Sequence, residues 1–337
     1  MGKSDVLSCN IMDNPLYFAD TINNGLFDGK EVVKAENLKE LDSTENAVLE
    51  DALKNIIAMK KERDNIKHAK FLRDDKAIYV IIGIENQTYI NYAMPVRTLF
   101  YDALRYAKQV ESISNHYKHA SGNKKTTIIG NAEFLSGMRK NDRIEPVITL
   151  TVYYGTKEWD GALSLHEMFD DNVDTDIISL VPDYKVNLLE PKKISNWNLF
   201  KTDVGILFEM ISASDQKNGI DRLIANNPER FSEVNNDIVR AINFYTKCAI
   251  PVNELEENTN MCYAWESSMA EARGKGKIEG KIEGKIEGKI EGEENLIDLY
   301  SWLKASGREN EAEAIMKKEN ENLRKDLFKE YYSTLVK

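Results

Sequence analysis

Cysteine is scarce in this chain. Its 337 residues include only Cys9, Cys248 and Cys262, and no two of them have CxxC spacing. This excludes a disulfide framework and a cysteine-based zinc site, and it fits a reducing compartment. Long apolar runs are missing too: no stretch approaches the ~20 residues that a membrane span needs, and the first residues lack the apolar segment of a signal peptide. We therefore expect a cytoplasmic protein without a membrane partner.

Positive charge is in deficit. Lys and Arg number 45 against 56 Asp and Glu, which gives a formal net charge of -11. A protein that coats DNA over its whole surface is normally basic, so this balance argues against global electrostatic binding of nucleic acid and leaves room for local contact. The motifs GxGxxG, GxxxxGK[ST], GxSxG and HExxH are also absent. These absences give little support to an unrelated α/β enzyme.

The chain is organised around residues 63–87, RDNIKHAKFLRDDKAIYVIIGIENQ. Its first ten residues alternate loosely, RDDK has turn chemistry, and AIYVIIGI is almost wholly apolar and β-branched. This pattern predicts a β-hairpin whose second strand is buried on both faces. Because the turn centre is equidistant from Asp64 and Glu85, the hairpin would place these carboxylates opposite each other. Two carboxylates on one strand pair form a candidate site for a divalent cation with oxygen ligands.

Each candidate ligand also has a simpler interpretation. Asp64 could cap a strand and Glu85 could begin a loop, since most carboxylates are exposed. His68 falls on the Asp64 side of the expected sheet and is a further candidate ligand, although a histidine there is more often a packing or surface residue. The spacing of these residues alone leaves the alternatives open.

A family resemblance adds to this pattern. Asp64, followed by Glu85-Asn86-Gln87 at the end of an apolar strand, resembles the D…(D/E)xK signature of PD-(D/E)XK nucleases. The runs GIENQ, NYAMPVRTLFYDALRYAKQV and VITLTVYYGTKEWDG are similar to one branch of that superfamily, the recombination-promoting nuclease or transposase family of bacteria. The resemblance covers roughly residues 16–271.

The resemblance implies a fold and an activity. The expected fold is a restriction-endonuclease-like α/β core, a mixed central sheet flanked by helices, with a C-terminal helical extension. The expected function is metal-dependent hydrolysis of DNA phosphodiesters in recombination or transposition. Asp64, Glu85 and the backbone carbonyl of Asn86 would hold Mg²⁺, with Mn²⁺ as an alternative, and Asp20 on the first helix is a further candidate ligand. Magnesium is preferred because the ligands are oxygens and no Cys/His cluster offers a softer site.

One residue departs from the superfamily pattern. Gln87 stands where the signature has lysine, at a catalytic position. Glutamine neither takes a proton nor carries charge, so it can only position water or phosphate. The named branch often shows glutamine there, which keeps activity compatible with the sequence. The alternative function is a catalytically weak or inactive nuclease fold that acts as a DNA-binding or assembly module.

A long helix is predicted over residues 95–118, with Pro95 at its first turn. Residues three or four apart on one of its faces form the candidate DNA-binding set: Arg97, Tyr101, Arg105 and Lys108. For Arg97 and Tyr101 the resemblance implies a site role, because they match the RxxxY of the family helix. Lys118, Lys124 and Lys125 further along the chain could also contact phosphate, and their simpler interpretation is a solvated helix face.

Other patterns complete the expected organisation. Strands are predicted within residues 32–41, 144–154 and 184–189, helices within 15–24, 46–60, 163–169, 199–211, 219–225 and 231–246, and a loop over 121–137. We expect a nuclease-like core over 1–195, an accessory helical region over 196–272, a KIEG-repeat linker or helix over 273–292, and a helical tail over 293–337.

Four consecutive KIEG units occupy Lys277 to Gly292. Like charges four residues apart and a glycine in every unit, at about 1 kcal/mol each against alanine, predict a flexible spacer or frayed helix. If the isoleucine stripe were packed, it would wrap right-handed, because its period exceeds 3.6. The tail could dock another subunit. A homodimer is expected, since cutting both strands of a duplex favours two-fold symmetry.

Overall fold

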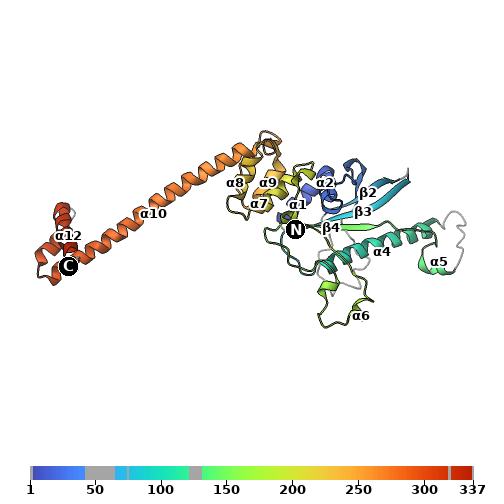
Figure 1. The fold of residues 1–337 in the computed structure, drawn as a ribbon, viewed down its shortest axis with the longest axis horizontal. Helices are drawn as coiled ribbons and strands as arrows, with labels where there is room; N and C mark the ends of the chain where they lie inside the picture. Colours follow the sequence, from blue (N-terminus) through green and yellow to red (C-terminus); the bar gives the residue numbers. More distant parts are fainter. Residues whose placement is uncertain (1–2, 42–64, 74–75, 121–130, 318–319, 336–337) are drawn as a thin grey trace. The chain divides into compact units, whose positions relative to one another are not determined.

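The computed structural model describes residues 3–41, 65–73, 76–120, 131–317 and 320–335 (Figure 1). The chain forms two compact units, residues 1–265 and residues 266–337. Among the described residues, no helix is long and apolar enough to cross a membrane.

The first unit contains a mixed five-stranded sheet in the order β1-β2-β3-β4-β5. Its strands are β1 (Leu38–Glu40), β2 (Asn65–Arg73), β3 (Lys76–Gln87), β4 (Val147–Tyr153) and β5 (Asn187–Leu189). The pairs β1–β2 and β2–β3 are antiparallel, whereas β3–β4 and β4–β5 are parallel. With helices packed against this sheet, the predicted α/β class with a mixed central sheet is confirmed.

The predicted hairpin is the centre of this sheet. Arg73 pairs with Lys76 and Asn65 with Ile84, so the turn falls where the sequence places it. Successive side chains of β3 point to opposite faces. Ile82, Ile84 and Asn86 therefore share one face, and Ile81, Glu85 and Gln87 share the other.

The Ile84 face is covered by helices from both ends of the first unit. They are α1 (Lys3–Asp13), α2 (Pro15–Leu26), α7 (Val204–Ala213) and α9 (Asn236–Thr246). Their buried apolar side chains form one core with the strands; its members include Phe18, Ile22, Ile82, Ile84, Leu150, Val152, Leu207, Phe208 and Ile238. The sequence of α7, VGILFEMISA, is apolar apart from Glu209 and Ser212, as expected of a helix buried in a core. The predicted accessory helices thus share their core with the sheet.

The Glu85 face is covered by α4 (Met94–Ala120), the predicted long helix. Polar contacts fix α4 on the sheet: Thr149 Oγ1 donates to Asp102 at 2.6 Å, and the backbone N–H of Val147 donates to the Tyr106 hydroxyl at 3.0 Å. Figure 1 shows α4 running along β4. The sheet is therefore sandwiched between an apolar layer and a layer rich in polar side chains.

Several local predictions differ from the structure. The first strand is reduced to β1, preceded by a 3₁₀ turn over Ala35–Asn37. Within the expected loop over 121–137, Asn131–Ser136 forms the short helix α5. The helix expected over 46–60 lies outside the described residues. Further short elements of the unit include α6 (Thr175–Ile178), α8 (Gly219–Asn226), β6 (Val234–Asn235), β7 (Asn258–Thr259) and 3₁₀ turns over His166–Met168, Pro191–Lys193 and Trp197–Leu199.

The second unit is helical, as predicted. It contains most of α10 (Met261–Ala305), with α11 (Glu309–Ile315) and α12 (Glu321–Leu335). Leu299, Leu303, Ala312, Ile315 and Leu327 form its core. The KIEG segment is helical throughout, where we expected a flexible spacer or frayed helix. Extending an existing helix costs far less than starting one, and α10 is anchored in a packed core on each side of the repeat, which offsets the glycine penalty.

Candidate functional site

The carboxyl end of β3 places Glu85 inside the molecule. Glu85 lies beside Thr151 of β4 in the parallel register, and none of its surface is exposed. Gln87, two residues on, shares its face, and the Gln87 side-chain amide donates to the Glu85 carboxylate at 3.3 Å. The sequence folds this way because a β-branched apolar run forms the buried strand and carries its last residues into the space beneath α4.

The first turn of α4 supplies the counter-charge. Arg97 forms an ion pair with Glu85, and its own side chain keeps 25% of its surface exposed. The Tyr101 ring lies one turn further on, with the guanidinium carbon of Arg97 5.6 Å from the ring centroid. Arg97 thus contacts both Glu85 and Tyr101, and it is the accessible member of the three.

A second polar cluster lies further along α4. The buried Asp102 accepts hydrogen bonds from the hydroxyls of Thr149 and Tyr184, and Arg105 is buried one turn further along the helix. Together with Glu85 and Arg97, this layer carries two acidic and two basic side chains. Residue-type and spacing arguments missed Asp102, Thr149 and Tyr184, because their association depends on α4 packing across β4.

The predicted DNA-binding residues do not form one surface. Arg97 is partly exposed and Lys108 is exposed, whereas Tyr101 and Arg105 are buried against the sheet. The four residues lie on one side of α4, and that side packs against the sheet at Tyr101 and Arg105 but not at Lys108. The four side chains therefore do not form a solvent-facing row that could contact phosphates.

Asn86 points to the opposite face and belongs to a buried amide network. Its side-chain amide donates to Asn65 Oδ1 at 3.1 Å, and the Tyr154 hydroxyl donates to Asn86 Oδ1 at 2.9 Å. Asn65 in turn donates to Asp13 Oδ1 at 2.8 Å. This network ties the ends of α1 and β4 to the start of β2, directly behind Glu85.

Asp20, a candidate ligand, is engaged elsewhere. Its carboxylate accepts hydrogen bonds from the backbone N–H groups of Lys201 and Thr202 at 2.9 and 2.8 Å and from the Thr202 hydroxyl at 2.7 Å. Burial raises the pKa of Asp20. Because α2 packs on the Ile84 face, Asp20 holds the segment before α7 and is not among the contacts that surround Glu85.

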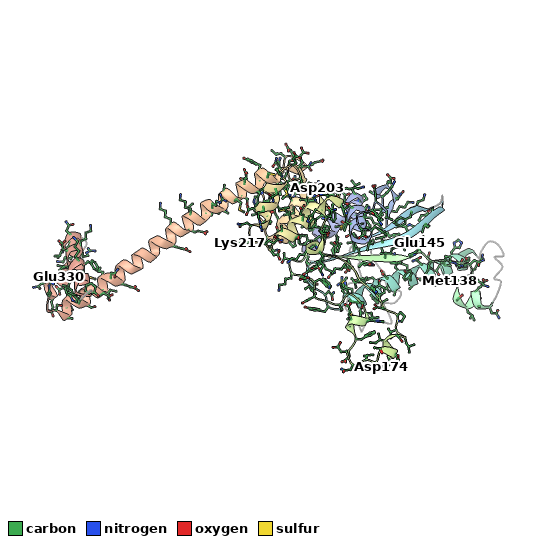
Figure 2. The ribbon with its side chains drawn as sticks, viewed as in Figure 1. Met138, Glu145, Asp174, Asp203, Lys217 and Glu330 are labelled. Carbon is green, nitrogen blue, oxygen red and sulfur yellow. The ribbon has the colours of Figure 1, made fainter. Side chains whose placement is uncertain are left out.

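His68 is also committed to another contact. Its Nε2 lies 2.7 Å from a carboxylate oxygen of Glu145, which is labelled in Figure 2, and its ring stacks on Tyr79 with centroids 5.0 Å apart. This is the packing role named above as the simpler interpretation.

Asp64, the second predicted carboxylate, lies outside the described residues. Among the residues that are described, no group of three or more His, Cys, Asp or Glu side chains is arranged to hold a metal ion. Around Glu85, the described residues supply the buried Glu85 carboxylate, the neutral side-chain amide of Gln87 and the partly exposed guanidinium of Arg97. Such a set can hold a cation through Glu85 or an anionic group through Arg97, and in either case the ion pair between them must open.

The chain was compared with protein-family models, with curated proteins and with solved structures, and none of the three comparisons finds a match.

Proposed function

We propose that the chain is a metal-dependent DNA endonuclease of the recombination-promoting nuclease or transposase type, with its active centre at the carboxyl end of β3. The observation that supports this proposal is the complete burial of Glu85 beside Gln87 and Arg97. Burying a carboxylate costs several kcal/mol unless it is paired with a cation, hydrogen-bonded or bound to a metal ion. A glutamate and a glutamine two residues apart on one strand face also agree with the ExQ pattern of the resemblance.

The donor set at this position suits Mg²⁺ or Mn²⁺. Gln87 and Arg97, which contact Glu85, contain neither a thiol nor an imidazole, and hard divalent cations prefer oxygen ligands. We assign Asp64, Glu85 and the backbone carbonyl of Asn86 as the ligands. A metal bound there would polarise the scissile phosphate and lower the pKa of the attacking water.

The neighbouring side chains take positioning roles. Arg97 binds a phosphate of the substrate when it leaves Glu85, which couples DNA binding to release of the carboxylate. The Tyr101 ring holds the Arg97 guanidinium in place through a cation–π contact. Gln87 orients water or phosphate with its amide and moves no proton. Lys108, exposed further along α4, contacts the DNA backbone.

The test is nicking of supercoiled plasmid with Mg²⁺ present. Wild type should convert the plasmid to the open-circular form, whereas Asp64→Ala and Glu85→Gln should lose the activity. Asp20→Asn is the matched control, because it neutralises another buried carboxylate, on the far face of the sheet, and should leave nicking unchanged. Equal nicking by wild type, Asp64→Ala and Glu85→Gln would contradict the proposal.

A second function has a specific observation in its favour: a DNA-binding or assembly module that keeps the nuclease fold without its activity. Arg97 already neutralises Glu85, and Gln87 replaces the expected lysine. This function requires that DNA is retained without cleavage and that Mg²⁺ leaves the melting temperature unchanged. A salt series of DNA binding would separate it from a protein that ignores DNA.

A further inference from the structure

The KIEG repeat makes four distinct rows along α10. Successive residues of an α-helix are about 100° apart, so the four positions of each unit fall on four sides of the helix. Going round the helix, the order is lysine, isoleucine, glutamate and glycine, since the repeat occupies residues 277–292 without interruption. The isoleucine row and the glycine row lie on opposite sides, and each is flanked by lysine on one side and glutamate on the other.

Where α10 is described around the repeat, its surface is open. A Cβ added at Gly274, Gly276, Gly280 or Gly292 would meet no other atom within 4 Å. Ile278, the first isoleucine of the repeat, has 62% of its surface exposed. A helix that has both an apolar row and a row of small residues, with nothing packed against the described positions, offers a face for another helix.

The order of the charges specifies which helix fits. If two copies of α10 lie side by side and parallel, two-fold symmetry brings the lysine row of one copy beside the glutamate row of the other on both flanks of the contact. If they lie antiparallel, symmetry brings lysine beside lysine and glutamate beside glutamate. This holds whether the isoleucine rows or the glycine rows form the contact, because both have the same kind of flanks. Charges that flank an apolar helix seam select partner and orientation in this way.

We propose that residues 277–292 are the docking surface for a second copy of this chain, which binds with its α10 parallel. The period of four sets the crossing. Rows of residues four apart are the ridges that interdigitate in the helix pairs with a right-handed crossing of about −50°. Glycines spaced four apart also permit close backbone approach in right-handed crossings. The inference uses α10 alone and stands whether or not the chain cleaves DNA.

The first experiment measures the mass of the full-length chain in solution by light scattering. Wild type should have twice the 38.5 kDa mass of one chain. Two charge variants keep every isoleucine and glycine: an all-glutamate variant changes the four lysines and an all-lysine variant changes the four glutamates. The positions are Lys277, Lys281, Lys285 and Lys289 for the first variant and Glu279, Glu283, Glu287 and Glu291 for the second. Each variant alone should be monomeric, with a dimer Kd raised roughly tenfold or more by the facing like charges.

Mixing the two variants is the decisive step. The equimolar mixture should form a one-to-one complex, because opposite charges then face each other again. The control carries both sets of changes, so that lysine and glutamate exchange rows; it should dimerise like wild type. Circular dichroism checks that every variant keeps its helix content. A monomeric wild type, a charge variant that dimerises as wild type does, or a mixture without complex would each overturn the proposal.

Cross-linking then reports the orientation. Ile282→Cys and Ile286→Cys lie next to the centre of the repeat, where two crossing helices come closest, and each should form a disulfide with its own counterpart in a parallel pair. An antiparallel pair would instead join position 282 to position 286 when the two variants are mixed, and this result would overturn the proposal. The unsubstituted chain, with Cys9, Cys248 and Cys262, provides the background.

Discussion

Removing the charge of Arg97 should destabilise the first unit, because it takes a counter-ion away from the fully buried Glu85. Arg97→Met keeps most of the side-chain stem and deletes the guanidinium. Breaking a fully buried pair by removing one partner costs about 3–5 kcal/mol. Because 25% of the Arg97 side chain is exposed, some water reaches the pair, and we expect a loss of about 3 kcal/mol, at the low end of that range.

Urea unfolding followed by tryptophan fluorescence measures this loss. Three of the four tryptophans, Trp159, Trp197 and Trp265, lie within residues 1–265 and report on that unit. Arg240→Met is the matched control: Arg240 is 42% exposed and pairs at 2.8 Å with exposed Asp237 and with Glu254. Exposed pairs contribute about 0–1 kcal/mol, so the control should change little.

A double variant tests the cause of the loss. Glu85→Gln combined with Arg97→Met removes both charges of this ion pair, so it should be more stable than Arg97→Met alone. If Glu85 binds a divalent cation, Mg²⁺ should raise the stability of Arg97→Met more than that of wild type, since the arginine no longer competes. A loss below about 1 kcal/mol for Arg97→Met, or a double variant less stable than the single one, would refute the reasoning.

Two further variants probe the Ile84 face and its helices. Tyr154→Phe removes the hydroxyl that donates to Asn86 and should cost about 1 kcal/mol in urea unfolding, with an unchanged value arguing against the amide network. Burial raises the pKa of Glu209 above its ordinary value of 4.5. Above that raised pKa the carboxylate is charged in the folded protein, which lowers the free energy of unfolding. This loss of stability disappears as the pH falls toward 4.5, because the group is then protonated in both states. Wild type should therefore gain stability relative to Glu209→Gln as the pH is lowered from neutral, and a difference that stays constant with pH would contradict the assignment.

Local sequence signals predicted the hairpin and α4. The RDDK turn between two strand-like runs fixes a register without help from the rest of the chain, and the structure pairs Asn65 with Ile84 accordingly. The recurrence of apolar residues over 95–118 predicted a helix now seen as Met94–Ala120. In both cases the information lies within 30 residues of sequence, which is the range over which periodicity operates.

The site could be predicted only in part, because helix periodicity shows which residues share a side and not which side packs. Arg97, Tyr101, Arg105 and Lys108 were grouped correctly as near neighbours, yet Tyr101 and Arg105 turn inward. The contact between Asp102 and Tyr184 joins residues 82 apart in sequence. No local pattern marks such a pair. The helix α1 was missed because its sequence, KSDVLSCNIMD, has little amphipathic contrast.

The two faces of β3 suggest what the buried polar layer is for. On one face Ile82 and Ile84 pack into an apolar core, which covers the sheet without desolvating any charge. On the other face Glu85, Gln87 and the side chains of α4 bury charges whose desolvation is offset only if each finds its partner. A well-packed apolar layer at the same place would hold the helix at least as firmly. Folding stability alone therefore does not account for the acidic and basic residues beneath α4, and a site that binds ions gives a reason for their presence.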